Sequence, residues 1–328
     1  MQNELWKQKR ILEPVKHFRH LKLLGKIDHG CDAVVFKCSP ILHNVDAQPL
    51  AAKVLINYGI ETLLVGKSFE KEYQILKSLP FHPNIIPILR EFTDRPPQEY
   101  IDLFPADVQS LAVKEVGGET RMTLCILMPI LESFEEYLRR EFSRLGIKKK
   151  IAFISDVASA LKFLFDYNVV HRDMKLNNLL IDSAGRIILS DFGHALQTQD
   201  DKKMLIHPKE GMGGNPRRLA PEIKSINLRQ STDAIMVDYS KQPSFELGMI
   251  AFEVLFGKLP ELSEFGETMD NAYFNKICLT GSQHLISPFF GWIQSLLFED
   301  PSKRVTLDFA IKQFNQIMKK LDAKKAFQ

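Results

Sequence analysis

The chain has 328 residues and a formal net charge of +3, with 45% hydrophobic and 25% charged residues. This length suits one large domain or two smaller lobes, and the balance of residue types is that of a soluble globular protein. The small positive charge argues against a nucleic-acid partner, because no stripe of Lys and Arg stands out. No apolar run reaches the length of a membrane-spanning helix, so we expect no membrane span.

The N-terminus and the cysteines indicate a cytoplasmic protein. Residues 1–10 mix charged and apolar side chains without an apolar core, which argues against a secretory signal. Acidic Glu4 and Glu13 argue against a transit peptide. The four cysteines are scattered and complete no zinc pattern with histidine, as expected of reduced thiols in the cytosol.

The first part of the sequence predicts strands and one main helix. Residues 33–36 and 50–55 are short, apolar and bounded by Gly, Pro or Asn, as strands are. Apolar residues recur at helical spacing over 69–79, which predicts an amphipathic helix. Residues 124–128 then predict a buried strand that Pro129 ends.

The part beyond residue 130 is mainly helical in its pattern. Apolar spacing predicts helices over these segments: 134–142, 151–165, 245–256 and 305–321. Two stretches, 94–120 and 225–238, are expected to be loops or inserts. The sequence therefore predicts an α+β fold with a small β-rich lobe, a larger helical lobe and a ligand cleft between them.

The strongest signal of chemistry is a polar block over residues 171–178, which Asp191-Phe192-Gly193 follows after a short apolar run. Asp173 can accept the proton of an attacking hydroxyl, and Lys175 can neutralise charge on a transferred phosphate. Asn178 offers a neutral oxygen, and Asp191 a carboxylate, to a hard cation such as Mg²⁺. The block therefore predicts metal-assisted phosphoryl transfer.

Two further motifs lie far apart in the chain. Ala220-Pro221-Glu222 ends the segment that begins at Asp191, and Arg304 closes the motif Asp300-Pro301-Ser302-Lys303-Arg304. Glu222 and Arg304 are suited to a buried ion pair that would be structural. Together with the block at 171–178, these motifs resemble those of the eukaryotic protein kinase superfamily, over about residues 21–318.

The resemblance implies the two-lobed kinase fold with ATP and Mg²⁺ as cofactors. The implied organisation is an N-terminal extension (1–20), a kinase domain (21–318) made of an N-lobe (21–128), a hinge (129–131) and a C-lobe (132–318), and a C-terminal tail (319–328). Lys53 would be the strand lysine that contacts the phosphates, with Glu72 as its helix partner and Glu70 as the alternative. The implied ATP site further contains Gly30, Val35, Ala51, the gatekeeper Met128, and the hinge residues Pro129 and Leu131.

Two places depart from the family pattern. Asp28 and Ala33 stand where the loop over the phosphates has glycines, which predicts reduced ATP affinity because a carboxylate near the triphosphate is unfavourable. Pro243 stands where many kinases have an aspartate that holds the backbone of the catalytic loop. We expect Glu246 or Asp238 to take over that role.

Residues near the expected acceptor site favour serine or threonine over tyrosine as acceptor. Lys175 is typical of Ser/Thr kinases, and Asn215 can replace their usual threonine by bridging Asp173 and Lys175. Arg217 and Arg218 either favour acidic residues near the acceptor or are solvated at the surface. The predicted partner is a protein substrate with a Ser or Thr acceptor.

Thr198 is the single hydroxyl residue between Asp191 and Ala220. Its phosphorylation would order this segment through Arg172 or nearby lysines. Thr198 stands early in the segment, which lowers the weight of this hypothesis.

Four stretches are similar to the mitochondrial ubiquitin-phosphorylating kinase linked to Parkin: 30–35, 82–86, 213–215 and 237–241. Mitochondrial placement and ubiquitin as substrate are not transferred, since we expect neither the transit peptide nor the membrane segment of that family here. The favoured function is an active Ser/Thr protein kinase. The alternatives kept are a pseudokinase that acts as a nucleotide-binding scaffold and a small-molecule phosphotransferase of related fold. The sequence leaves the oligomeric state unknown.

Overall fold

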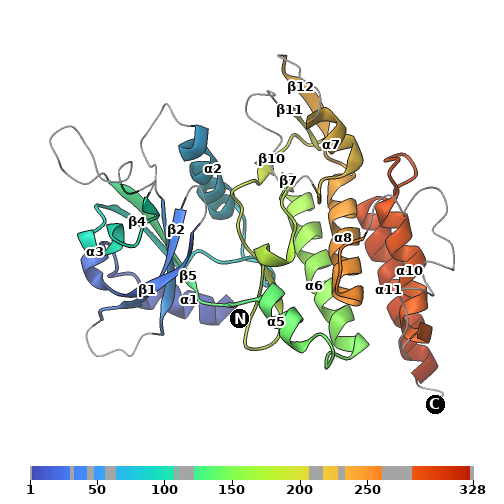
Figure 1. The fold of residues 1–328 in the computed structure, drawn as a ribbon, viewed down its shortest axis with the longest axis horizontal. Coiled ribbons are helices and arrows are strands. Elements are labelled where there is room, and N and C mark those ends of the chain that lie inside the picture. Colours follow the sequence, from blue (N-terminus) through green and yellow to red (C-terminus); the bar gives the residue numbers. More distant parts are fainter. Residues whose placement is uncertain are drawn as a thin grey trace. The chain divides into compact units, whose positions relative to one another are not determined.

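The structure, a computed structural model, describes residues 2–29, 33–42, 48–55, 64–106, 109, 122–206, 217–227, 233–260 and 283–325. The chain divides into two compact units, Met1–Leu131 (unit 1) and Glu132–Gln328 (unit 2). Unit 1 is built on a sheet, and unit 2 is mainly helical (Figure 1). The predicted α+β fold is thereby confirmed, whereas the predicted bounds of extension, domain and tail stay a prediction.

Unit 1 contains a five-stranded antiparallel sheet with the strand order β1-β2-β3-β5-β4. Its strands are β1 (Leu21–His29), β2 (Ala33–Pro40), β3 (Leu50–Leu55), β4 (Arg90–Asp94) and β5 (Thr123–Pro129). Its helices are α1 (Gln2–Ile11), η1 (Phe18–His20), α2 (Leu64–Ser78) and α3 (Gln98–Ile101). The predicted strands and the predicted main helix are all present.

One face of this sheet is covered by segments that the sequence placed outside it. Phe36 of β2 is fully buried, and its ring lies 5.0 Å from the ring of Tyr100 on α3. Phe18, from the predicted extension, lies 4.9 Å from the same Tyr100 ring. Residues 94–120 were predicted to be a loop or insert, but α3 lies within them because Tyr100 supplies core that the sheet needs.

The described part of unit 2 combines helices with one three-stranded sheet and two two-stranded sheets of short strands. Its helices are α5 (Phe134–Glu141), α6 (Ile147–Asp166), η2 (Leu176–Asn178), α7 (Pro221–Asn227), α8 (Gln242–Phe256), α10 (Gln283–Leu297) and α11 (Leu307–Lys325). Its strands are β6 (Glu132–Ser133), β7 (Val169–Val170), β8 (Leu179–Ile181), β9 (Ile187–Leu189), β10 (Leu196–Gln197), β11 (Lys203–Ile206) and β12 (Ile235–Asp238).

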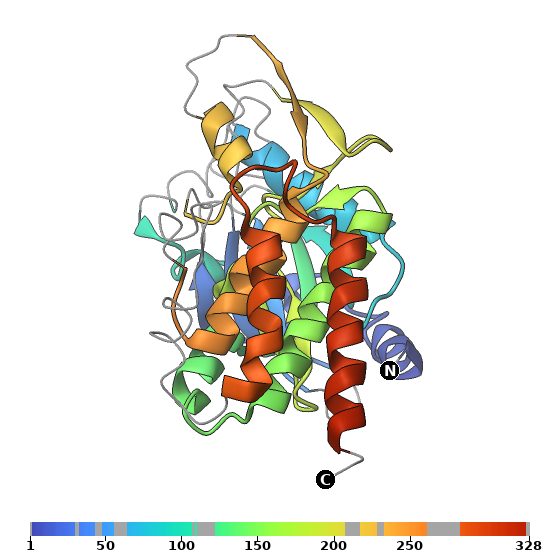
Figure 2. The same cartoon turned by 90° about the vertical axis from the view of Figure 1, so that its right-hand side faces the viewer.

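Helix α8 is the buried helix that the apolar run predicted. It packs against both α6 and α10, and Figure 2 shows α10 beside α11. The approach to α10 requires Gly248, since a Cβ at this position would lie 2.8 Å from Leu296 Cβ. The helix ends at Gly257, whose φ of 72° lies in the left-handed region that glycine favours.

The short strands position the polar block. β8 and β9 pair antiparallel, with Leu179 opposite Leu189, so the residue before β8 lies close to the residue after β9. β10 pairs with β7, and β11 pairs with β12 in a two-stranded ribbon. β12 falls in residues 225–238, which were predicted to be a loop or insert. In the described part of the chain, no helix combines the length and apolar character that crossing a membrane requires.

Candidate active site

The polar block forms a loop between β7 and β8, here called the catalytic loop (residues 171–178). Asp173 in this loop is 2% exposed. Its Oδ2 accepts hydrogen bonds from Lys175 Nζ at 2.6 Å and from Asn178 Nδ2 at 2.9 Å. Asn178 Nδ2 also donates to the Asp173 backbone oxygen at 2.8 Å. The structure thus brings these three predicted residues into one group with a buried carboxylate at its centre.

Asp191 is held next to this group through the residue before it. The backbone N–H and the hydroxyl of Ser190 both donate to the backbone oxygen of Asn178, each at 2.9 Å. Asp191 is exposed and has a φ of 59°, a conformation that few non-glycine residues adopt. The backbone therefore turns sharply at Asp191, and Phe192 after it is fully buried.

His171 joins the two segments, a contact that the sequence reasoning missed. Its ring lies edge-on to Phe192 at 5.0 Å, and its Nε2 lies 3.1 Å from the Ser190 carbonyl oxygen. Burial is the main cause that lowers the pKa of His171, so the ring is neutral at pH 7. A neutral ring that donates to a carbonyl holds the loops together without adding charge. In the sequence, this contact was indicated by the position of His171 directly before Arg172 and Asp173.

The chemistry of the donors fits Mg²⁺. Asn178 uses its Nδ2 on Asp173, which leaves the carbonyl oxygen of the same amide as the atom suited to a hard cation. Asp191 adds a carboxylate from the adjacent turn. Among the described residues, no group of three or more His, Cys, Asp or Glu side chains could hold a metal ion. Mg²⁺ commonly takes only one or two protein carboxylates and completes its coordination with waters and phosphate oxygens.

Lys53 and Glu72 form an ion pair within unit 1. Lys53 Nζ on β3 lies 2.7 Å from both Oε1 and Oε2 of Glu72 on α2. Their side chains are 14% and 5% exposed, so water screens the pair weakly. The side chain of the alternative partner, Glu70, lies outside what the structure describes.

The strand register places three further predicted ATP-site residues of unit 1 on the same face as Lys53. Val35 lies opposite Lys53, and Ala51 lies opposite Met128. Residues opposite each other, or two apart on one strand, point to the same side of a sheet. The other three predicted ATP-site positions are Pro129, which ends β5, the partly buried Leu131, and Gly30, which lies outside the described residues. The part that each residue plays in ATP binding stays a prediction.

Arg218 is buried, unlike the solvated alternative that the sequence left open. It is 8% exposed and pairs with Glu253 of α8 at 2.8 and 3.0 Å. A side chain committed to a buried ion pair does not lie solvated at the surface. Arg217 is exposed, as the solvated alternative expected, and Asn215 lies outside the described residues.

Thr198 is poorly placed for phosphorylation. It is 7% exposed, and its hydroxyl donates to the Asn168 carbonyl oxygen at 2.9 Å. The backbone N–H of Thr198 donates to the same oxygen at 2.7 Å. A kinase could reach this hydroxyl only after the segment had left its position. The structure therefore argues against the hypothesis that Thr198 is a phosphorylation site.

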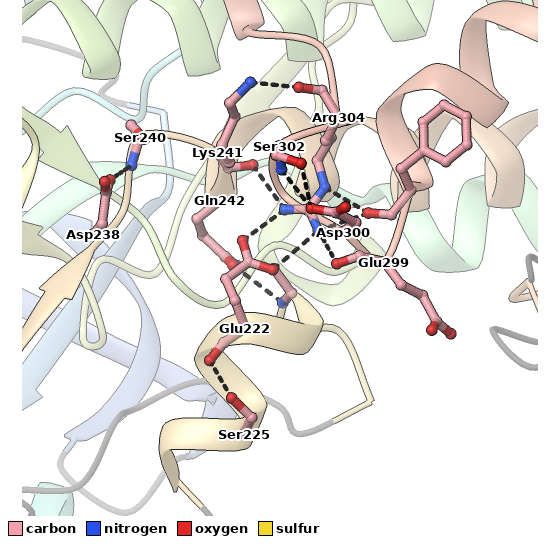
Figure 3. Close-up of polar contacts among 12 residues, drawn as sticks. Glu222, Ser225, Asp238, Ser240, Lys241, Gln242, Glu299, Asp300, Ser302 and Arg304 are labelled. Atoms are coloured by element: carbon pink, nitrogen blue, oxygen red, sulfur yellow. Dashed lines mark hydrogen bonds and ion pairs between the residues drawn. The ribbon is translucent and has the colours of Figure 1, made fainter. Parts of the chain in front are cut away.

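The predicted ion pair of Glu222 and Arg304 is confirmed. The two side chains meet through two parallel hydrogen bonds, Nη1 to Oε1 at 2.7 Å and Nη2 to Oε2 at 3.0 Å (Figure 3). The Arg304 side chain is fully buried. This pair ties α7 to the loop before α11.

Comparisons with known proteins identify the family of this chain. The sequence model of the family described as "Protein kinase domain" matches residues 21–319. The chain is 26% identical over 265 residues to an Aurora kinase of Encephalitozoon cuniculi, covering 80% of this chain and 82% of that protein. It is 25% identical over 292 residues to serine/threonine-protein kinase Sgk1 of Xenopus tropicalis, with 88% and 58% covered.

A third similar protein is the mitochondrial serine/threonine-protein kinase Pink1 of Tribolium castaneum. It is 29% identical over 265 residues, which cover 70% of this chain and 45% of that protein. The match thus covers about half the length of the Sgk1 and Pink1 relatives.

Proposed function

The chain belongs to the protein kinase domain family, and from that premise we propose that it is an active Ser/Thr kinase that uses Mg²⁺ and ATP. The observation that carries the proposal is the buried Asp173 carboxylate, which both Lys175 and Asn178 hold by hydrogen bonds. A carboxylate fixed in this way is pre-oriented to receive a proton. The names of the relatives and the presence of Lys175 support Ser or Thr as the acceptor.

Each side chain has a definable role in the proposed reaction. The substrate hydroxyl oxygen forms a bond to the γ-phosphorus, its proton passes to Asp173, and the bond to the leaving ADP oxygen breaks. Lys175 lies 2.6 Å from Asp173 and carries the positive charge that would stabilise the transferred group. Asn178 and Asp191 would hold the Mg²⁺, which neutralises charge on the phosphates.

Lys53 would contact the α- and β-phosphates of ATP. Its pairing with Glu72 fixes the ammonium group on the sheet face that also carries Val35 and Ala51. These two small apolar side chains suit a flat adenine ring. The hinge contacts of ATP would come from the Pro129 carbonyl and the Leu131 amide, with Met128 before them.

A cytoplasmic location is part of the proposal. Cys38 and Cys125 are buried free thiols, which suits a reducing compartment. Burial raises the pKa of Cys38 to about 12, so this thiol is unreactive.

Phosphoryl transfer by the purified protein tests the proposal. Radiolabelled ATP with Mg²⁺ and a mixture of casein and a basic protein would be compared for wild type, Asp173→Asn and Asp308→Asn. Asp308 is an exposed carboxylate at the start of α11 and makes a matched control. We expect Asp173→Asn to lower the rate by about 10²–10⁴-fold and Asp308→Asn to leave it unchanged.

Hydrolysis of the product should yield phosphoserine or phosphothreonine. If the wild type transfers no more label than Asp173→Asn but still binds ATP, the pseudokinase scaffold replaces the proposed enzyme. Phosphotyrosine as the main product would refute the assigned acceptor.

A further inference from the structure

The turn that follows α6 makes a set of polar contacts that the proposed reaction does not use. Asn168 stands directly after Tyr167, the residue that caps the helix, and directly before β7. Its φ of 58° lies in the left-handed region, which asparagine adopts more readily than most residues. Because only β7 separates Asn168 from the catalytic loop, this residue is well placed to couple another segment to that loop.

The polar groups of Asn168 contact the segment after Asp191 at three positions. Its backbone oxygen accepts hydrogen bonds from the N–H and the hydroxyl of Thr198, at 2.7 and 2.9 Å. Its side-chain Nδ2 donates to Asp200 Oδ1 at 2.8 Å, and its Oδ1 accepts a hydrogen bond from Lys202 Nζ. One half-buried residue thus holds the chain before and within the turn that leads from β10 to β11.

Lys202 extends these contacts to the end of α6. Its Nζ donates to the Phe165 carbonyl oxygen at 2.7 Å and lies 4.5 Å from the centre of the Phe165 ring. Carbonyl groups at a helix C-terminus carry partial negative charge and favour a nearby cation. Helix α6 has no basic residue in its own last turn, so Lys202 supplies this cation from 37 residues along the chain.

The backbone of Lys202 is committed as well. Its φ of 63° is left-handed, and its N–H donates to the Gln199 carbonyl oxygen at 2.9 Å. Its carbonyl oxygen accepts a hydrogen bond from the N–H of the buried Tyr239 at 2.9 Å. The turn is therefore fastened both to the end of α6 and to the residues that precede α8.

These contacts anchor the far end of a segment whose near end is already fixed. At the near end, Ser190 donates twice to the Asn178 carbonyl oxygen. At the far end, β10 pairs with β7 and Asn168 holds the residues that follow β10 (Figure 1). Asp191 lies between the two anchors, so losing the second would leave it held from one side.

We infer that Asn168 is a positioning residue, and that its amide acts with Lys202 to hold residues 196–202 in place beside the catalytic loop. The inference rests on the proposed kinase function, because the position of this segment matters through Asp191 and the transfer reaction. The holding groups are an amide, an ammonium and a carboxylate of the chain itself.

The same arrangement needs no phosphate. Thr198 is the single hydroxyl residue between Asp191 and Ala220, and its hydroxyl is already one of the donors to Asn168. The segment therefore contains no other Ser, Thr or Tyr whose phosphorylation could order it. Lys202 and Asn168 supply that order from within the chain.

Glycine is the sharpest substitution at both positions, because it keeps a left-handed backbone and removes only the side chain. Asn168→Gly removes the amide, and Lys202→Gly removes the ammonium. Asn168→Asp keeps an oxygen for Lys202 and tests rescue. Lys203→Ala is the control, since Lys203 is a neighbouring lysine, 43% exposed, that pairs with Asp201.

Hydrogen exchange of the 194–201 peptide measures the anchoring directly. We expect exchange about tenfold faster in each glycine variant, because each loses a hydrogen bond to a charged group. The double variant should exchange more slowly than the product of the two effects, since both changes remove the same contact. Asn168→Asp should lie closer to wild type than Asn168→Gly, and Lys203→Ala should equal wild type.

The rate of phosphoryl transfer measures the consequence. We expect kcat to fall about tenfold in Asn168→Gly, as displacement of a catalytic group does, and to recover in part in Asn168→Asp. Exchange that rises in the glycine variants alone supports the anchoring even if the wild type transfers no phosphate, a result that would refute only the proposed function.

Two results would overturn the inference. One is equal exchange of the 194–201 peptide in Asn168→Gly and wild type. The other is an active wild type whose kcat is unchanged in Asn168→Gly although exchange has risen. Where Asn168→Gly does not fold, Lys202→Gly is compared with Lys203→Ala in the same way, and equal exchange in these two variants overturns the inference.

Discussion

Replacing Arg304 by methionine should destabilise unit 2 severely. Besides its two bonds to Glu222, Arg304 donates from Nε and Nη2 to the Phe298 carbonyl oxygen at 2.9 and 2.7 Å. It also lies over the Phe245 ring, with its guanidinium carbon 4.9 Å from the ring centre. The substitution keeps the apolar stem and removes every polar contact at once.

The expected loss in the free energy of unfolding depends on the Glu222 charge that Arg304→Met leaves without its partner. Breaking one partner of a buried ion pair costs about 3–5 kcal/mol. The Glu222 side chain is 21% exposed, so water can solvate part of its charge, and we place Arg304→Met near the lower end. Glu222→Gln keeps an acceptor for Arg304 and should cost about 1–2 kcal/mol. The double variant should cost less than the sum, because both changes remove the same contact.

Urea unfolding at pH 7 measures these differences. Arg144→Met is the control, since its side chain is 80% exposed and its ion pair with Glu141 spans 3.7 Å. A change of at most about 0.5 kcal/mol is expected there. If Arg304→Met lowers the free energy of unfolding by less than about 1 kcal/mol, the account of this pair as a structural tie is refuted.

Three further outcomes are expected. Gly248→Ala should lower the free energy of unfolding by about 1–3 kcal/mol, measured by urea, because the new methyl meets Leu296 at 2.8 Å. Because burial raises the pKa of Glu246, the folded chain keeps a proton on this group between about pH 4.5 and 8, whereas the unfolded chain releases it. The free energy of unfolding of wild type, relative to that of Glu246→Gln, should therefore fall by up to about 1.4 kcal/mol per pH unit over this range. Asp28→Gly should lower KM for ATP in steady-state kinetics, and an unchanged KM would contradict the expectation that this carboxylate repels the triphosphate.

The parts of the molecule that the sequence predicted depend on local spacing. The nearly all-apolar stretch over 245–256 predicted a buried helix, and α8 is one. Asp173, Lys175 and Asn178 lie within six residues of each other, so one loop brings them together whatever surrounds it. The pairing of Lys53 with Glu72 follows from the helix spacing that favoured Glu72 over Glu70.

The parts that the sequence missed depend on contacts between distant segments. Tyr100 is polar enough for a loop, and nothing near it in the chain shows that Phe18 and Phe36 would enclose it. The adjacent residues Arg217 and Arg218 have the pattern of a solvated pair, but Arg218 is buried because it pairs with Glu253 of α8. The burial of Arg218 depends on a partner 35 residues away. Such a dependence produces no periodic pattern in the sequence.

Contacts between distant residues also hold the described part of the segment after Asp191 in place. Thr198 is tied to Asn168 by its hydroxyl and its N–H, and Arg172 is tied to the His194 carbonyl oxygen. A phosphate on Thr198 would have to break the first contact, and Arg172 already has a partner for its Nε. These hydrogen bonds hold the segment beside the catalytic loop with neutral acceptors. The order of its described part therefore does not depend on phosphorylation of Thr198.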